Sequence, residues 1–244
     1  MKTIALNLAL IILSALFMTA CEKETFKIVP SNNIISKQHA ITDFNELDIS
    51  GPFKVYVTFS ATEQGLRIEA NDNLHGIIEV EQNNGRLSVK LKNRTTIQNG
   101  GAVLNVFVTT NDIETINAQG AAEIYLQNQW NEDRVAIELE GACSFKGSLA
   151  VNQLNAKLVG ASDLEIEGSA DHFDIEAEGA SNMEGFDFET DHLSADLKGG
   201  CNVSLTVHDK LNVQAVGASN VYYKGSGVIE NQNLTGGSQI KKMD

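Results

Sequence analysis

Apolar and polar residues alternate along the second half of the chain, from about residue 111 to residue 240, and a glycine recurs at intervals of 18 to 21 residues. A small residue lies two positions after each glycine, and an apolar residue lies four positions after it. This period of two is typical of a strand with one buried face. Self-similarity at a nearly fixed interval predicts a repeat architecture. The recurring glycines are Gly120, Gly141, Gly160, Gly179, Gly199, Gly217 and Gly236.

Each repeat has room for at least two short strands in about 19 residues, which is too short for a four-stranded propeller blade. No helical period accompanies it. The pattern therefore predicts a parallel β-helix (β-solenoid), right-handed as parallel crossovers usually are, with equivalent residues stacked roughly 4.8 Å apart. The glycine would form a corner, where a positive φ or a close backbone approach excludes a Cβ atom.

A second column of short polar residues precedes these glycines by eight positions. Asp and Asn side chains hydrogen-bond their own backbone two residues on, so we interpret the column as a second corner. A column of carboxylates is also a candidate Ca²⁺ site, although Ca²⁺ takes about six or more oxygen ligands. The column contains Asp112, Asp133, Asn152, Asp171, Asp191 and Asp209.

Residues 45–110 alternate as well but lack the repeated glycine phrase. We expect this irregular β half to close one end of the solenoid, because an open end would present unpaired strand edges. The fold class is therefore all-β, with one β-solenoid domain over residues 45–240 and regular repeats over residues 111–240. Strands are expected at Leu47–Ile49, Phe53–Phe59, Leu66–Ala70, Ile78–Gln82, Leu87–Leu91 and Leu104–Thr109.

The beginning of the chain has the parts of an export signal. Residues 1–20 contain one basic residue, an apolar run and small residues before Cys21, which predicts a signal peptide. The stretch from Met18 to Cys21 resembles a bacterial lipobox. On that resemblance Cys21 is lipidated and anchors the protein to a membrane, whereas simple cleavage would leave a free cysteine. Residues 21–44 are then the lipidated N-terminus and a flexible polar tether.

The formal net charge of the chain is −14. A charge of this sign opposes binding to nucleic acid and to anionic lipid surfaces, so no nucleic-acid partner is expected. The same charge keeps an exported protein soluble.

Several phrases together resemble one known family. They are the run from Ile49 to Val55, Asn73-Leu74 before a strand, the run from Gly85 to Leu87, and the repeated Gly-Ala-Ser-Asn. Over roughly residues 44–225 the chain resembles the head GIN domain family of putative auto-transporter adhesins (DUF2807). The resemblance implies a β-helical, exported, non-enzymatic domain of envelope lipoproteins. The chain departs from the family in placing Cys143 and Cys201 where Ser or Ala is usual.

Cysteine and histidine pairs are candidates for chemistry. Cys143 and Cys201 share a column but stand three coils or roughly 14 Å apart, which is too far for a disulfide, so we expect buried, reduced thiols. His172 and His192 share another column in adjacent coils, where they would form half of a zinc site. That column elsewhere holds other polar residues, which favours an exposed turn. We therefore predict neither a metal nor a cofactor.

Outward-facing tyrosines and carboxylates are the remaining candidates. Tyr125 and Tyr222 share the column five residues after the glycine and Tyr223 follows, so these three form a candidate ligand surface. Alternating acids, among them Glu165 and Glu176, are compatible with glycoside hydrolysis. They are also what a solvated strand face ordinarily carries. No flanking aromatic platform accompanies them, so we do not expect an enzyme.

The sequence thus predicts an exported envelope lipoprotein that acts as a non-catalytic binding or adhesin-like module through the lateral faces of a β-solenoid. Its ligand would be a polysaccharide or a protein, and its location the outer membrane, on the cell surface or the periplasmic face. Two alternatives stay open. One is a carbohydrate-active enzyme on a β-helix, and the other is a periplasmic scaffold for another envelope protein.

Overall fold

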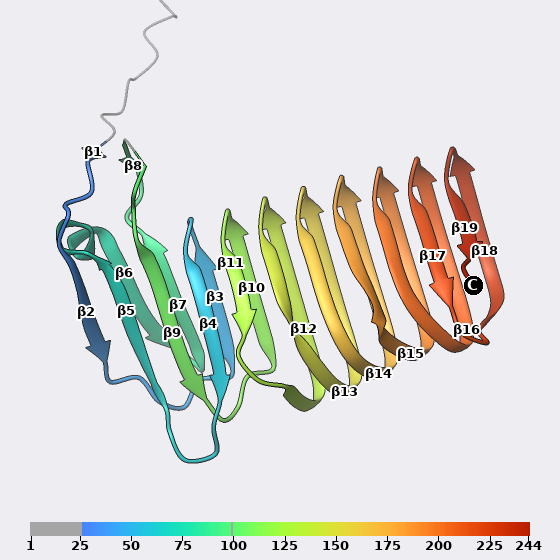
Figure 1. Ribbon diagram of the computed structural model, residues 1–244, viewed down its shortest axis with the longest axis horizontal. Coiled ribbons are helices and arrows are strands. Elements are labelled where there is room, and N and C mark those ends of the chain that lie inside the picture. Colours follow the sequence, from blue (N-terminus) through green and yellow to red (C-terminus); the bar gives the residue numbers. More distant parts are fainter. Residues whose placement is uncertain (1–25, 99) are drawn as a thin grey trace, which may run out of the picture.

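The computed structural model describes residues 26–98 and 100–244, and it is built almost entirely of strands. Seventeen strands form one sheet that winds into about seven turns at a spacing of roughly 19 residues, which confirms the predicted β-solenoid (Figure 1). The predicted signal peptide and Cys21 lie outside the described residues. Within those residues, no helix has the length and apolar character needed to cross a membrane.

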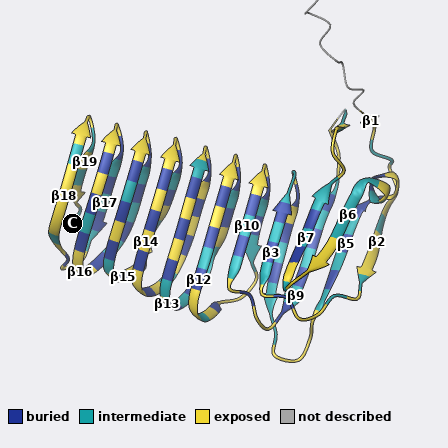
Figure 2. Cartoon of the chain, turned by 180° about the vertical axis from the view of Figure 1, so that it is seen from behind, coloured by how far each residue is buried: buried dark blue, intermediate teal, exposed yellow. Residues whose placement is uncertain are grey.

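The regular repeats stack parallel and in register. Gly141 pairs with Gly160, Gly160 with Gly179, and so on to Gly236, so each column of the sequence is a row in space. Along the strands buried and exposed residues alternate (Figure 2). The strands are β10 (Thr115–Gly120), β11 (Glu123–Leu126), β12 (Trp130–Gly141), β13 (Ser144–Gly160), β14 (Asp163–Gly179), β15 (Asn182–Gly199), β16 (Asn202–Gly217), β17 (Asn220–Lys224), β18 (Val228–Gly236) and β19 (Gln239–Lys242).

The glycine corners are the tightest points of the stack. Their φ angles lie between +74° and +113°, a region that residues with a Cβ rarely adopt. The amide of Ala180 donates to the carbonyl of Gly160 in the coil below at 2.7 Å. A Cβ added at Gly179 would stand 2.4 Å from that same oxygen. The corner therefore excludes every side chain on two grounds, its dihedral angle and its close backbone contact.

The Asx column lies where the ladders are interrupted. Pairing of β12 with β13 skips from Glu132 to Arg134, and pairing of β13 with β14 skips from Val151 to Gln153. In this gap the Asn152 amide donates to the Asp133 carboxylate at 2.5 Å. Among the described residues, no group of three or more His, Cys, Asp or Glu side chains is arranged to hold a metal ion.

The core is a narrow stack of inward side chains. Large and small residues alternate in it, as Ile175 and Ala177 do, and each buried large aliphatic side chain contributes about 1.5–3 kcal/mol. Trp130 is fully buried, and its Nε1 donates to the Ile113 carbonyl at 2.8 Å. Cys143 and Cys201 are both buried and free, as the register predicted.

The N-terminal half extends the same walls but not in chain order. Strand β3 (Glu46–Ser50) lies between β7 (Arg86–Leu91) and β10, and β4 (Lys54–Phe59) lies between β9 (Leu104–Thr110) and β11. The first coil of the chain is thus inserted between two later ones. This end is finished by antiparallel strands, β6 (Ile78–Asn83) on β7 and β5 (Gly65–Asn71) on β9. A 3-10 helix, η2 (Asp72–Ile77), joins β5 to β6.

Part of the predicted tether is folded, which corrects that expectation. Strand β1 (Phe26–Ile28) pairs with β8 (Thr95–Ile97), and β2 (Ile34–His39) pairs antiparallel with β5 over six residues. Strand β2 is an edge strand whose residues are mostly exposed. It is held by backbone hydrogen bonds rather than by buried apolar side chains, so its polar composition resembled a linker.

The C-terminal end is closed by polar residues in core columns. Gln232 pairs with the buried Val213, and Lys242 pairs with the buried Tyr223, with its Nζ 5.8 Å from the ring centroid. Inward polar and charged side chains on a last strand discourage pairing with a further strand. The two ends are therefore finished differently, the first by antiparallel strands and the second by side-chain chemistry.

The corner column gives a test of the stacking constraint. We expect Gly179→Ala to lower the free energy of unfolding by at least about 2 kcal/mol, because it adds both dihedral strain and a clash with Gly160. Chemical denaturation monitored by circular dichroism measures this loss. The matched control is Gly200→Ala, since the nearest atom to a Cβ at Gly200 is 4.0 Å away and its φ is not positive. An equal loss in both variants would contradict the corner argument.

Candidate functional site

One outward row of side chains runs along the whole lateral face of the solenoid. It begins on edge strand β2, passes through the inserted coil and continues through every regular repeat. Equivalent positions on successive strands are neighbours, so the row is continuous in space. In order it contains Gln38, Arg67, Phe107, Tyr56, Tyr125, Lys146, Glu165, Glu184, Ser204, Tyr222 and Lys241.

The first part of the row is an aromatic ladder. The rings of Tyr125 and Tyr56 stack with centroids 5.5 Å apart, and those of Tyr56 and Phe107 stack at 5.1 Å. The Arg67 guanidinium lies 3.7 Å from the Phe107 ring centroid. Because the rings face one another, they present their edges to solvent and not their faces. The ladder therefore stabilises the junction of the two halves and offers little flat surface for stacking on a sugar.

A carboxylate fixes the end of this ladder. The Tyr125 hydroxyl donates to Glu123 Oε2 at 2.7 Å, and Lys54 Nζ lies 3.3 Å from the same oxygen. The hydrogen bond from Tyr125 lowers the pKa of Glu123, with Lys54 acting in the same direction against the opposing effect of burial. In return, the bond to Glu123 raises the pKa of Tyr125 to about 12. The phenol is therefore neutral at physiological pH.

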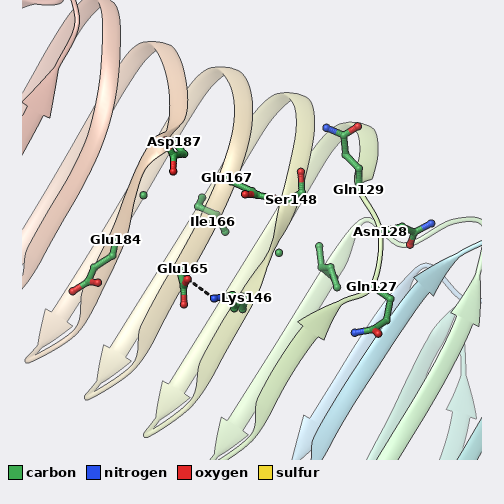
Figure 3. A pocket seen from close by; sticks show the side chains of 13 residues that line it. Gln127, Asn128, Gln129, Lys146, Ser148, Glu165, Ile166, Glu167, Glu184 and Asp187 are labelled. Carbon is green, nitrogen blue, oxygen red and sulfur yellow. Dashed lines mark hydrogen bonds and ion pairs between the residues drawn. The ribbon is translucent and has the colours of Figure 1, made fainter.

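A groove of about 700 Å³ opens beside the middle of the row (Figure 3). One wall is the loop of residues 127–129 that follows β11, and the other is the segment of β15 near Gly185 and Asp187. Asn128 holds the loop, since its Oδ1 accepts from the Phe59 amide and its Nδ2 donates to the Phe59 carbonyl, both at 2.8 Å. The loop wall is therefore preformed.

The second wall exists because β15 bulges. Strand β14 has two residues between Glu165 and Gly168, whereas β15 has three between the paired positions Glu184 and Phe188. The register between β15 and β16 shifts at the same place. With this extra residue, Phe186 and Asp187 are both exposed. The Thr206 hydroxyl donates to the Phe186 carbonyl at 2.8 Å, and Lys224 Nζ lies 5.1 Å from the Phe186 ring centroid. A bulge of this kind redirects side chains at a chosen point in an otherwise regular sheet.

The groove lining is polar and predominantly acidic. Lys146 is the single basic residue among the described residues that line it, and it pairs with Glu165 at 2.5 Å. Glu167, Glu184 and Asp187 add three further carboxylates. Amide groups of the loop and the Ser148 hydroxyl supply donors as well as acceptors. This set of groups suits a neutral or cationic ligand that is rich in hydrogen-bonding groups.

Comparison with known proteins places this architecture in a family. The profile described as "Putative auto-transporter adhesin, head GIN domain" (DUF2807) matches residues 43–227. The chain belongs to this family. No curated protein matches the chain.

Solved structures share the family fold. A putative adhesin from Bacteroides fragilis is 21% identical with a TM-score of 0.81, covering 88% of this chain and 100% of its own. A putative lipid binding protein from Parabacteroides distasonis is 16% identical with a TM-score of 0.74, and the match covers 89% of this chain and 100% of that protein's chain. A putative adhesin from Parabacteroides merdae is 17% identical with a TM-score of 0.68, and the match covers 90% of this chain and 100% of that protein's chain. At these identities the likeness shows the fold.

The predicted surface residues of this GIN-domain chain do not all lie together. Tyr125 and Tyr222 stand on the same row, with four residues between them. Tyr223 is only 6% exposed and belongs to the core, which corrects its assignment to a ligand surface. The reason is the strand period, since Val221 and Tyr223 point inward and Tyr222 between them points outward. Tyr56 and Phe107 were missed because the irregular half carries no phrase to align with the repeats.

Of the other candidates, His172, His192 and Glu176 lie on a different wall from the groove, and only Glu165 lines it. His172 and His192 stack with ring centroids 4.7 Å apart, and His192 Nδ1 is 3.7 Å from Asp209 Oδ2. Glu165 lines the groove, whereas Glu176 lies beyond the Asx corner and lines other hollows. These two carboxylates therefore do not face a common ligand position.

The Tyr125–Glu123 bond predicts a pH-dependent stability difference. The pKa of Glu123 is lowered in the folded state. The bond therefore stabilises the folded protein at pH values above the ordinary carboxyl pKa, and this stabilisation is lost as the pH falls through the pKa of Glu123 in the folded state. We expect Tyr125→Phe to cost about 0.5–1 kcal/mol at pH 7, since solvent screens a half-exposed pair. The difference should shrink below about pH 4.

Denaturation of both proteins at pH 7 and pH 3 measures this difference. Tyr222→Phe is the control. It removes a hydroxyl from the same row, but among the described residues no carboxylate accepts a hydrogen bond from the Tyr222 hydroxyl. A pH-independent cost for Tyr125→Phe would contradict the linkage.

Proposed function

We propose that this chain is an exported envelope lipoprotein, anchored through lipid on Cys21, that binds a ligand without catalysis through one lateral face. It would act at the outer membrane, on the cell surface or the periplasmic face. The observation that carries the proposal is the preformed groove beside Lys146 and Glu165, which interrupts an otherwise regular wall. Solenoids use extended faces of this kind as binding surfaces.

The groove chemistry favours a polysaccharide over a lipid chain. Leu126 and Ile166 are the only large apolar residues among the described residues that line it, and Ile166 is itself buried in the wall. Carboxylates and amides instead match the hydroxyl or amino groups of a sugar polymer. The adhesin names of the family and of two structural relatives support a binding role. The lipid-binding name of another relative finds little support in this groove.

Two other functions compete with this proposal. A carbohydrate-active enzyme would use the groove carboxylates for hydrolysis, and the Lys146–Glu165 ion pair would then have to open. A periplasmic scaffold would use the same face for another envelope protein. It predicts a stoichiometric protein partner and no affinity for glycans.

Blocking the groove tests the binding role directly. We expect Ser148→Trp to weaken binding to an array of immobilised polysaccharides by at least about tenfold, because the indole would occupy the space between the two walls. Ser194→Trp is the matched control, since it places the same side chain in a different hollow on another wall. Equal binding by the two variants would contradict a groove site. Polysaccharide turnover that Glu165→Gln or Glu176→Gln abolishes would establish the enzyme instead.

The anchor is tested by location in intact cells. We expect the wild-type protein to fractionate with outer membranes and Cys21→Ala to be released, because this change removes the acceptor for lipid. Added protease and antibody then report exposure. Digestion in intact cells that depends on Cys21 supports an adhesin role, whereas protection until the outer membrane is permeabilised moves the site of action to the periplasm. Fractionation that Cys21→Ala leaves unchanged would contradict the anchor.

A further inference from the structure

We propose that the N-terminal end of the solenoid, formed by β1, β8 and the segment from Val29 to Ile34, docks on the phospholipid leaflet that holds the anchor. The solenoid would then stand on the membrane with its regular repeats projecting away. This inference rests on the proposed lipid anchor at Cys21. Figure 1 shows β1 and β8 beside the point where the described chain begins, at one extreme of the long axis.

Exposed apolar side chains gather at this end. Phe26 is 69% exposed, Val29 is 51% exposed and Ile34 is 48% exposed. They lie within nine residues of one another in the sequence, whereas the other large exposed apolar side chains of the described residues, Phe186, Val216 and Val228, are far along the solenoid. Exposed apolar patches commonly mark a surface that another phase or molecule covers, and we interpret these three side chains as such a surface.

The backbone that carries these side chains is held in place. Asn73 accepts from the Ser31 amide at 2.9 Å and donates to the Val29 carbonyl at 2.8 Å. The Asp72 amide donates to the Asn33 carbonyl at 2.8 Å, and the Phe26 amide donates to the Arg94 carbonyl at 2.8 Å. Val29 and Ile34 are therefore fixed outward on a folded platform and cannot turn into the core.

Charge is distributed unevenly along the axis. Residues 26–110 contain eight basic and eight acidic residues, whereas residues 111–244 contain eight basic and 22 acidic residues. The whole net charge of −14 therefore resides in the regular repeats. Exposed Lys27, Lys92 and Arg94 lie on or beside β1 and β8, and Asp72, whose amide bonds to Asn33, is an acid of the same end. The sequence between Cys21 and Phe26 adds Glu22, Lys23 and Glu24. An anionic leaflet would attract this end and repel the rest.

Chain length leaves little freedom. The five residue steps from Cys21 to Phe26 span at most about 18 Å even when fully extended. An acyl group at Cys21 would therefore keep the apolar patch close to the headgroups whatever the conformation of the intervening residues. Apolar side chains at such an interface enter about 5–10 Å into the boundary of headgroups and acyl chains. The bilayer is accordingly the nearest surface that can cover the patch.

Tryptophan fluorescence in vesicles tests the docking. The mature protein, with Phe26→Trp or with Val228→Trp, is reconstituted in phosphatidylethanolamine and phosphatidylglycerol vesicles with and without brominated acyl chains. Val228 is the control because it is 66% exposed and lies on the last coil. Trp130, the one native tryptophan, is fully buried and is common to both variants. We expect a shift to shorter wavelength and at least about twofold stronger bromine quenching for Phe26→Trp, as burial at the acyl boundary requires.

The anchor and the docking are separated before reconstitution. Mass spectrometry of the mature protein shows whether Cys21 carries acyl groups. If it does not, the Cys21 thiol is coupled to a maleimide-bearing lipid. The coupling is selective for Cys21 because Cys143 and Cys201 are buried, and burial also raises the pKa of the Cys143 thiol. The docking measurement is then made on a tethered protein in either case.

Three outcomes would overturn the docking. One is equal quenching of the two variants, and another is an unshifted Phe26→Trp emission that acrylamide quenches freely. The third is a Phe26→Trp side chain that is protected from acrylamide quenching in native membranes but not in lipid vesicles. That result would assign the patch to a protein partner. Replacing Phe26, Val29 and Ile34 by Ser, with Lys27→Trp as reporter, should abolish the quenching, and its persistence would also contradict the proposal.

Discussion

The close, in-register stacking of successive coils is the constraint on which the structure depends. At each corner a backbone amide reaches the carbonyl of the coil below, as Ala180 reaches Gly160, and this contact leaves no volume for a Cβ atom. Once the corners are in register, the columns that flank them are in register too, and the shifts are confined to the segments between corners, as at the bulge of β15. Buried columns then form the core, and polar columns form ladders. In the ladder of Asp163, Asn182, Asn202 and Asn220, each asparagine Nδ2 donates to the side-chain oxygen of the residue in the coil before it.

Regular stacking also explains where a ligand site can arise. A wall in which every strand pairs in register with the next is flat, so a concave site requires a departure from the repeat. The chain has two such departures on one face, the loop held by Asn128 and the bulge of β15. They enclose the groove between them. The aromatic ladder on the same face has the opposite role, because its stacked rings join the inserted coil to the regular repeats.

The two ends of the molecule differ in chemistry as well as in topology. Antiparallel strands, exposed apolar residues and a balanced charge finish the N-terminal end. Core-facing Gln232 and Lys242 finish the acidic C-terminal end. A rod with such ends has a direction, which the proposed membrane-anchored binding module would need in order to present a lateral face away from the bilayer.

The repeat pattern was enough to predict the β-solenoid, its corner glycines, the buried free cysteines and the family, because every repeat makes the same local contacts and the copies can be aligned on one another. The remaining features depend on contacts between distant parts of the chain. Tyr56 stacks between Phe107 and Tyr125 only because the coil of β3 and β4 is inserted out of chain order, and nothing in a linear period encodes that insertion. The folded strand β2 and the groove likewise depend on backbone pairing and on a register shift, which leave almost no trace in the pattern of apolar and polar residues.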